Sequence, residues 1–230
     1  MARKKKEDAE KTRQQLIEAA IVQFSTRGVA STTLTDIADA ANLTRGAIYW
    51  HFSSKSEIFN AIWEQQLPLR EIIRDRLSLS KEDDPLLMLR EQFIASLQFI
   101  ARDPHQCALL QILYHKCEFN SDMISECEIR NRIGINDEYL RGTLEQCILR
   151  KVISPNVNIE LALIVFHGFF SGVIKNWLMN SDSFNLYQQA PALVDNILGT
   201  LPVIRLSPQD DVYTSAPGNI SPCSQSASIV

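Results

Sequence analysis

The sequence lacks the patterns that β-strands and most enzymes carry. No segment alternates apolar and polar residues like a strand, and no hairpin signal occurs. There is also no glycine-rich phosphate loop, no pair of carboxylates at a recognisable spacing and no nucleophile elbow. We therefore expect an all-α protein that is not an enzyme, with no catalytic residues, no metal site and no cofactor.

The chain also lacks the marks of export and of a membrane span. Its charged N-terminus has no apolar segment behind it, so no signal peptide is expected. The longest uncharged apolar run, Leu161 to Ile174, has 14 residues and falls short of the roughly 18 that a membrane span requires. Five cysteines without a secretion signal favour reduced thiols. These features predict a cytoplasmic protein with no membrane partner.

Charge is spread unevenly over the 230 residues. The net charge is −4, so bulk charge does not make the whole molecule a binder of polyanions. The first 55 residues nevertheless hold nine Lys and Arg against six Asp and Glu, while the remainder is acidic. A basic end on an acidic body indicates that this end meets phosphate.

The stretch from Thr33 to Phe52, TLTDIADAANLTRGAIYWHF, predicts two short helices joined by a tight turn. Apolar residues recur at helical spacing along its first half, and Thr33 with Asp36 forms an N-cap and a short capping box. Asn42 ends that helix, because Asn tolerates the left-handed conformation of a sharp exit. Thr44 caps the second helix.

The second helix of this stretch turns polar side chains toward solvent. Ile48 and Phe52 lie four residues apart and face inward, and the spacing of Ala38, Asn42 and Ile48 follows the helix-turn-helix pattern. Donors at the N-terminal end of such a helix are typical of a recognition helix in a major groove. The alternative, a hairpin within an ordinary core, gives no reason to align polar residues on one face. The exposed set is Thr44, Arg45, Tyr49 and His51.

The elements that flank the motif are also helical in pattern. We expect a helix from about Glu7 to Arg27, after a basic, disordered arm at residues 1–8 that is either a solvated charge run or a further DNA contact. Ser54 caps the helix that follows the motif, and Pro68 should kink or break it. Lys55 in its first turn suits a phosphate bound at the start of the helix.

The rest of the chain, from Asp84 to about Leu201, is helical in period, which gives about nine helices in all. Two helices are expected to begin at Asp84-Pro85 and at Asp103-Pro104. The region 121–151 is expected to form one helix, or two broken near Gly134. The last two helices are expected over 158–179 and over 186–201, the latter interrupted at Pro191. The predicted domains are a helix-turn-helix domain at 9–55, a ligand-binding and dimerisation body at 56–205 and a disordered tail at 206–230.

The run Leu161 to Ile174 is apolar around its whole circumference, so its helix has to be covered on more than one side. One cover is the body itself, and the other is a second copy of the chain. Gly168 and Gly172 would permit close approach of helices at such a contact. Complete burial within one chain is the alternative, although a body of six helices offers limited cover.

Histidine and cysteine recur as His105-Gln-Cys107 and His115-Lys-Cys117, and Cys127 continues the spacing of ten. Residues two apart on a helix point to different faces, so neither pair can hold one ion without unwinding. Buried thiols and half-buried histidines are the simpler interpretation. A redox- or metal-responsive DNA-binding regulator is the alternative function.

These residues resemble the TetR family of bacterial transcriptional regulators over about residues 8–200, most specifically in TLTDIADAANLTRGAIYWHFSSKSEIF. The segments IW at 62–63, LYHKCEF at 113–119 and SGxxxNWL at 171–178 are similar to the AcrR type, which represses multidrug efflux pump operons locally. The resemblance implies a homodimer, with the last two body helices of each chain at the interface, bound to a palindromic operator in double-stranded DNA. A small apolar or cationic inducer would enter the body and release the DNA.

The resemblance also implies which residues contact DNA, whereas the inducer contacts are predicted from aromatic chemistry alone. By its chemistry Arg45 suits a guanine edge, whereas the other polar residues suit phosphates. The expected DNA contacts are Thr33, Thr44, Arg45, Gly46, Tyr49, Trp50, His51 and Lys55. Aromatic residues on the body helices are candidate inducer contacts, with plain core packing as the alternative, and they are Trp63, Phe93, Phe119, Phe166 and Phe170.

Overall fold

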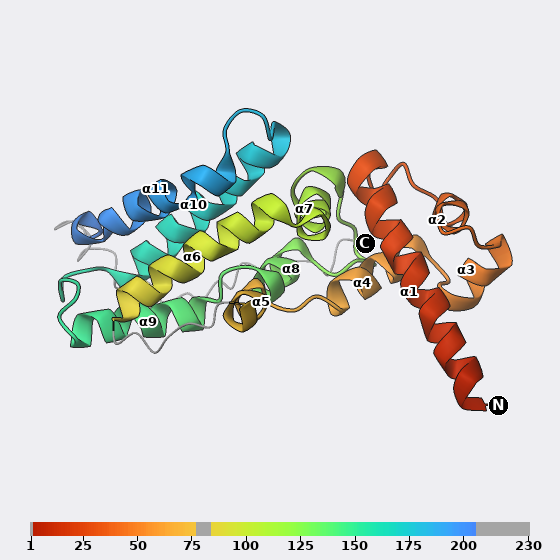
Figure 1. The fold of residues 1–230 in the computed structure, drawn as a ribbon, viewed down its shortest axis with the longest axis horizontal. Coiled ribbons are helices and arrows are strands. Elements are labelled where there is room, and N and C mark those ends of the chain that lie inside the picture. The colour runs from red at the N-terminus through yellow and green to blue at the C-terminus, as the bar shows by residue number, and fades with distance from the viewer. Residues whose placement is uncertain (1, 77–83, 206–230) are drawn as a thin grey trace, which may run out of the picture. The chain divides into compact units, whose positions relative to one another are not determined.

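The protein is helical throughout the part that its computed structural model describes, residues 2–76 and 84–205, where α1 to α11 and two shorter helical turns occur without a strand (Figure 1). This confirms the all-α prediction. The chain divides into two compact units, one of Met1–Leu67 with Ile100–Ile133 and the other of Pro68–Phe99 with Gly134–Val230. The sequence instead divided the chain after residue 55, so the first unit contains more than a helix-turn-helix domain. The predicted tail at 206–230 lies outside the described residues.

The first unit is organised around α1 (Ala2–Arg27), whose buried stripe is Leu16, Ile17, Ala20, Ile21 and Phe24. The helix begins at Ala2, where the sequence predicted a disordered arm through residue 8. The reason is that no glycine or proline interrupts the chain between Ala2 and Arg27, and the lysines and glutamates there are good helix formers. The remaining elements of this unit are α2 (Leu34–Ala40), α3 (Arg45–His51), α4 (Lys55–Glu64), α7 (Pro104–Gln111), the π-helical turn η1 (Ile112–Lys116) and α8 (Glu126–Ile133).

The turns of the predicted motif are present. Gly28 at φ +88° ends α1, and Asn42 at φ +55° ends the α2 segment in the left-handed region. Thr33 and Asp36 form a complete capping box on α2. The Thr44 hydroxyl accepts the Ala47 N–H at 3.2 Å and caps α3. Local side-chain chemistry therefore sets both helix starts, as the sequence predicted.

The segment from α7 to α8 is attached to the rest of the first unit by polar bonds and by aromatic packing. The Lys116 carbonyl accepts the Val29 N–H at 2.8 Å. The Asn60 amide of α4 donates to the Asp122 carbonyl at 3.0 Å and accepts the Ile124 N–H at 2.8 Å. Phe119 packs edge-on against Phe59, with ring centroids 5.9 Å apart. These contacts explain why residues 100–133 belong to this unit.

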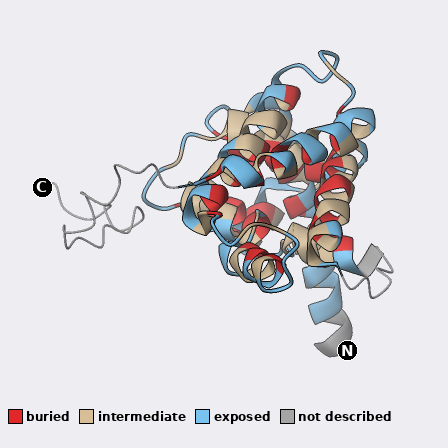
Figure 2. Ribbon diagram, turned by 90° about the vertical axis from the view of Figure 1, so that its left-hand side faces the viewer, coloured by how far each residue is buried: buried red, intermediate tan, exposed pale blue. Residues whose placement is uncertain are grey.

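The second unit contains α5 (Leu69–Arg76), most of α6 (Pro85–Arg102), α9 (Asp137–Leu149), α10 (Ile159–Met179), α11 (Leu186–Gly199) and the 3-10 turn η2 (Leu201–Val203). Buried residues line the inner sides of these helices (Figure 2). The Asp84 carboxylate accepts the Leu86 N–H at 2.9 Å, and the Asn158 amide oxygen accepts the Leu161 N–H at 3.1 Å, so both predicted starts are confirmed. The region 121–151 forms two helices, α8 and α9, that are separated around Gly134.

The two proline positions behave differently. At Pro68 the chain breaks, because α4 ends at Glu64 and α5 begins at Leu69. At Pro191 the predicted interruption is wrong, since α11 runs through it. Pro191 has no N–H for the carbonyl of Tyr187 four residues earlier, and the Gln98 side-chain amide donates to that carbonyl at 3.3 Å instead.

The helix α10 is long and apolar enough to cross a membrane by length and composition, with 21 residues and a mean hydropathy of 1.4 in its most apolar window. The sequence prediction missed this because it counted only the uncharged run, and the helix continues past it at both ends. Only 28% of that window is buried within the chain. Ile164 and Met179 are each 69% exposed. Partial burial leaves an apolar face on α10 that one chain does not cover.

Candidate nucleic-acid interface

The α2–α3 pair presents one face of α3 to solvent because its other face is buried. Ile37, Ile48 and Phe52 are buried, so the helix cannot turn without exposing its apolar side. This leaves Tyr49 and Trp50 with 48% and 72% of their surface exposed. The long α1 and the short α2 and α3 lie together (Figure 1), and the exposed side chains of α3 form a polar and aromatic surface.

The N-terminal half of that surface contains Thr44, Arg45 and Gly46. The Thr44 oxygen accepts a capping bond, so its own O–H remains a donor. The Arg45 guanidinium carbon lies 5.5 Å from the centroid of the Tyr49 ring. A Cβ atom on Gly46 would approach only the Thr44 hydroxyl oxygen, at 3.9 Å, so this position adds no bulk to the surface. These residues suit close approach to a base edge.

The C-terminal half of the surface contains Trp50 and His51. The two rings meet edge to face with centroids 4.4 Å apart. Burial, with a smaller contribution from the Arg13 charge, lowers the pKa of His51 below its ordinary value, while Glu10 opposes the shift. The imidazole is therefore neutral at pH 7 and would meet DNA as an uncharged donor or acceptor.

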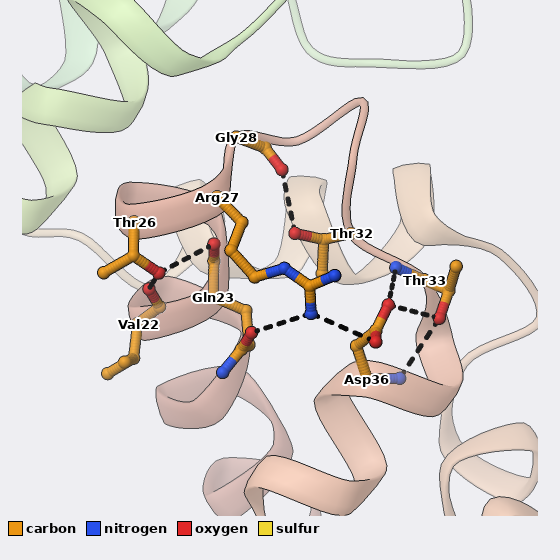
Figure 3. Close-up of polar contacts among 8 residues, drawn as sticks. All are labelled: Val22, Gln23, Thr26, Arg27, Gly28, Thr32, Thr33 and Asp36. Atoms are coloured by element: carbon orange, nitrogen blue, oxygen red, sulfur yellow. Dashed lines mark hydrogen bonds and ion pairs between the residues drawn. The ribbon is translucent and has the colours of Figure 1, made fainter.

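Thr33 differs from the other predicted DNA contacts because its donors are already used (Figure 3). Its N–H and its hydroxyl both donate to Asp36 Oδ2, at 2.8 and 2.6 Å. The Arg27 guanidinium lies 3.1 Å from the other carboxylate oxygen of Asp36 and joins α1 to α2. Bonds from Thr33, and then from Arg27, lower the pKa of Asp36 to about 2. A DNA contact from Thr33 stays a prediction, and it would compete with the cap.

Lys55 has a role that the sequence did not reveal. Its ammonium donates to the Val29 carbonyl at 2.6 Å and to the Ala30 carbonyl at 3.0 Å. The sequence argument inferred a phosphate because a cation in a first helical turn needs a counterpart, and these carbonyls supply one. A phosphate contact through the third N–H of Lys55 stays a prediction.

Two other residues of this unit had no local sequence signal. The Arg13 guanidinium of α1 lies over the Phe52 ring, 5.0 Å from its centroid, and so holds α1 against the end of α3. Asn60 holds the segment before α8, as described above. Both act across long stretches of chain, so helical periodicity alone could not have identified them.

The candidate inducer contacts form two aromatic clusters, one in each unit. In the first unit Phe59 contacts both Trp63 and Phe119, with centroids 6.0 and 5.9 Å apart. In the second unit Phe93 contacts Phe166 and Phe170, with centroids 6.1 and 4.5 Å apart. Trp63 is fully buried, and its indole Nε1 has no hydrogen-bond partner among the described residues. A buried donor without an acceptor is rare in proteins.

The metal- or redox-responsive alternative finds no support. Among residues 2–76 and 84–205 no group of three or more His, Cys, Asp or Glu could hold a metal ion. Cys107, Cys117 and Cys147 are free thiols. Burial raises the pKa of Cys117 to about 11, so that its reactive thiolate is scarce at neutral pH.

Comparison with known proteins agrees with this geometry. Residues 16–62 match the model of bacterial regulatory proteins of the tetR family, and residues 84–202 match that of the C-terminal region of MAATS-type transcriptional repressors. The chain belongs to the TetR family. TetR-family proteins are DNA-binding transcriptional regulators rather than enzymes, and α2–α3 is the helix-turn-helix of this member.

Individual relatives cover most of the chain. The probable acrEF/envCD operon repressor of Escherichia coli K12 is 52% identical over 198 residues, which are 86% of this chain and 90% of the relative. The regulator AcrR of Shigella flexneri is 37% identical over 83% of this chain and 89% of the relative. The structure of NalD, the secondary repressor of the MexAB-OprM multidrug efflux pump in Pseudomonas aeruginosa, is similar with a TM-score of 0.67 and 31% identity, covering 85% of this chain and 98% of NalD.

The capping box predicts an acid-sensitive part of the stability. The ordinary pKa of an Asp carboxyl is 3.8 and that of folded Asp36 is about 2, so the stabilisation by its carboxylate is complete above pH ~4 and is lost as the pH falls toward 2. Asp36→Asn should therefore lower the free energy of unfolding at pH 6. Between pH 6 and pH 3, the free energy of unfolding of the variant should fall by less than that of wild type. Urea titrations at both pH values measure this. Asp39→Asn on the same helix is the matched control, and equal acid losses in wild type and Asp36→Asn would contradict the prediction.

Proposed function

We propose that this protein is a ligand-released repressor of a multidrug efflux pump operon, which binds a palindromic operator as a homodimer. The observation that carries the proposal is an exposed Arg45 on the helix-turn-helix of a chain that is 52% identical to a probable acrEF/envCD operon repressor. NalD, which is similar over most of both chains, is described as repressing a multidrug efflux pump. A repressor that acts on chromosomal DNA works in the cytoplasm.

The exposed face of α10 supports the dimer. Its exposed residues Leu161, Ile164 and Gly168 follow helical spacing, and Gly172, one turn after Gly168, is half-buried. Apart from the backbone of α10 itself, no atom lies within 4 Å of the place that a Cβ atom would take on either glycine. Open space at two glycines four residues apart lets a second helix approach closely. The polar contacts of Glu160 with Arg141 and of His167 with Asp137 hold α10 against α9, which suits contact with protein and water rather than lipid. The second copy therefore covers this face.

A two-fold dimer determines the form of its operator. Each copy presents one α3, and the two-fold axis relates the two helices. Two identical α3 helices in successive major grooves recognise two inverted half-sites, so the operator is palindromic.

The effect of the inducer is proposed to be transmitted to the DNA-binding helices through α4. Trp63, Asn60 and Lys55 lie on this one helix, so a displacement at Trp63 acts on the Lys55 bonds to the turn after α1. The unpartnered Trp63 Nε1 favours a bulky apolar or cationic molecule that also carries a hydrogen-bond acceptor. Because coupling is reciprocal, that molecule also binds the DNA complex more weakly than the free protein.

Selection of the bound duplex from a random-sequence pool tests the operator proposal. The selected site should be an inverted repeat that also occurs upstream of an efflux pump operon. Arg45→Ala should weaken its binding by about 1–3 kcal/mol and relax the preference at one base pair in each half-site. Lys55→Ala should weaken all duplexes nearly alike and lower the salt slope by about one unit. Arg150→Ala, at the end of α9 in the second unit, is the charge-matched control, and identical behaviour of the first two variants would contradict the assigned roles.

The dimer proposal predicts the effect of a charge on α10. Gly172→Arg should convert the dimer to monomers, because an unpaired charge is costly to bury in an interface. A Cβ atom at this position meets no other atom within 4 Å, and Arg favours a helix more than Gly does, so the fold should persist. Sedimentation velocity measures the assembly, and circular dichroism checks the fold. Gly142→Arg on α9, which also has open space, is the matched control and should stay dimeric. A folded, dimeric Gly172→Arg variant would place the interface elsewhere.

The inducer proposal is tested most sharply by Trp63→Phe, since Trp63→Ala would leave a large cavity in the core. Phenylalanine keeps an aromatic ring and removes the N–H. Operator affinity without ligand should stay within a few-fold of wild type, whereas release by an acceptor-bearing apolar molecule such as progesterone should need roughly tenfold more ligand. Fluorescence anisotropy of the labelled operator measures both. If the variant is released as readily as wild type, the inducer does not bind through Trp63.

A further inference from the structure

Two exposed side chains of α3 form a cation–π pair. Arg45 opens the helix and Tyr49 follows one turn later, so both lie on the same face. The Arg45 guanidinium carbon is 5.5 Å from the centroid of the Tyr49 ring, within the range of a cation–π contact. About half of the tyrosine surface is exposed, so this pair faces solvent rather than the core.

The Tyr49 ring is the one partner of the Arg45 guanidinium within the part of the chain that the structure describes. No hydrogen bond or ion pair of that guanidinium occurs among residues 2–76 and 84–205. Arg27 of the same unit differs, because its guanidinium is occupied by Asp36 and Gln23. Arg45 therefore keeps all its N–H donors while its orientation is restricted by a neighbour.

This arrangement meets the geometric demand of base reading. An arginine recognises guanine with two parallel N–H donors at the edge of the planar guanidinium, and a cation–π contact with an aromatic ring requires no hydrogen bond from these donors. A free arginine side chain has about 2 kcal/mol of rotamer entropy to lose on binding. Tyrosine has only two side-chain torsions, so its ring forms a stiff support. Restriction before binding reduces the entropy that is lost in the complex.

We propose that Tyr49 is a positioning residue that holds Arg45 in the orientation for base reading, and that its ring rather than its hydroxyl does so. The proposal rests on operator binding by Arg45 as proposed above. It replaces the phosphate contact that the sequence predicted for Tyr49 with a role in specificity. Tyr49 then acts on the one base pair that Arg45 reads, and not on the affinity for DNA in general.

A double-mutant cycle on the full-length protein tests the proposal. The probes are the palindromic duplex that the wild-type protein selects from a random pool and its variants with one base pair changed in one half-site. Discrimination is the ratio of the two dissociation constants at fixed salt, measured for wild type, Arg45→Ala, Tyr49→Ala, Tyr49→Phe and the double alanine variant. Tyr49→Ala should reduce discrimination roughly two- to fivefold, about the strength of an exposed cation–π contact, and only at the pair that Arg45→Ala affects. Tyr49→Phe should stay within about twofold of wild type, and Tyr49→Ala should have no further effect in the Arg45→Ala protein.

Other outcomes overturn the proposal. If Tyr49→Phe and Tyr49→Ala weaken all duplexes equally, the hydroxyl contacts phosphate. If Tyr49→Ala still reduces discrimination in the Arg45→Ala protein, Tyr49 reads a base by itself. Failure of the wild-type protein to select any inverted repeat would contradict the operator proposal instead, so the two failures are distinguishable. Tyr49 is half exposed, and circular dichroism of each variant confirms that the helices are retained.

Discussion

The first unit depends on the peptide groups around Val29, where three segments of the chain meet. The Val29 N–H donates to the Lys116 carbonyl, and its own carbonyl accepts the Lys55 ammonium, so the turn after α1, the start of α4 and the end of η1 are joined at one residue. The left-handed Gly28 directs the chain into this position. A hydrogen bond to a charged group contributes about 1.5–3 kcal/mol. Because Val29 is buried as well, these bonds are shielded from competing water.

The same connections explain how one helix can serve two functions. Along α4, Lys55 contacts the turn that precedes the helix-turn-helix, Asn60 holds the chain before α8, and Trp63 lies in an aromatic cluster with an unpartnered donor. A rigid helix of 10 residues transmits a small rotation along its whole length, since packed interiors deform little. The segment from α7 to α8 is bonded to the same helix and belongs to the same unit as the DNA-binding helices.

Features set by neighbouring residues could be predicted from the sequence, whereas features set by distant residues could not. The caps at Thr33, Thr44 and Asn158 and the left-handed Asn42 depend on two to four consecutive residues, and all were predicted correctly. The exposed face of α3 followed from the period of Ile48 and Phe52. The carbonyl partners of Lys55 lie about 25 residues away in sequence, and no periodic pattern encodes such a meeting. The limits of α10 were predicted correctly, but its apolar length was underestimated, because only the uncharged run Leu161 to Ile174 was compared with the length of a membrane span.

The proline in α11 shows how an imperfection in one element can specify the position of another. An ordinary residue at 191 would satisfy the Tyr187 carbonyl within the helix and leave the Gln98 amide of α6 to find another acceptor. With proline there, the helix has no N–H at position 191 for that oxygen, and the Gln98 amide that donates to it joins α6 to α11. A backbone N–H at position 191 and the Gln98 amide would thus compete as donors to the Tyr187 carbonyl. An α11 with a regular residue at 191 would lack the Gln98–Tyr187 hydrogen bond as a contact that positions α6.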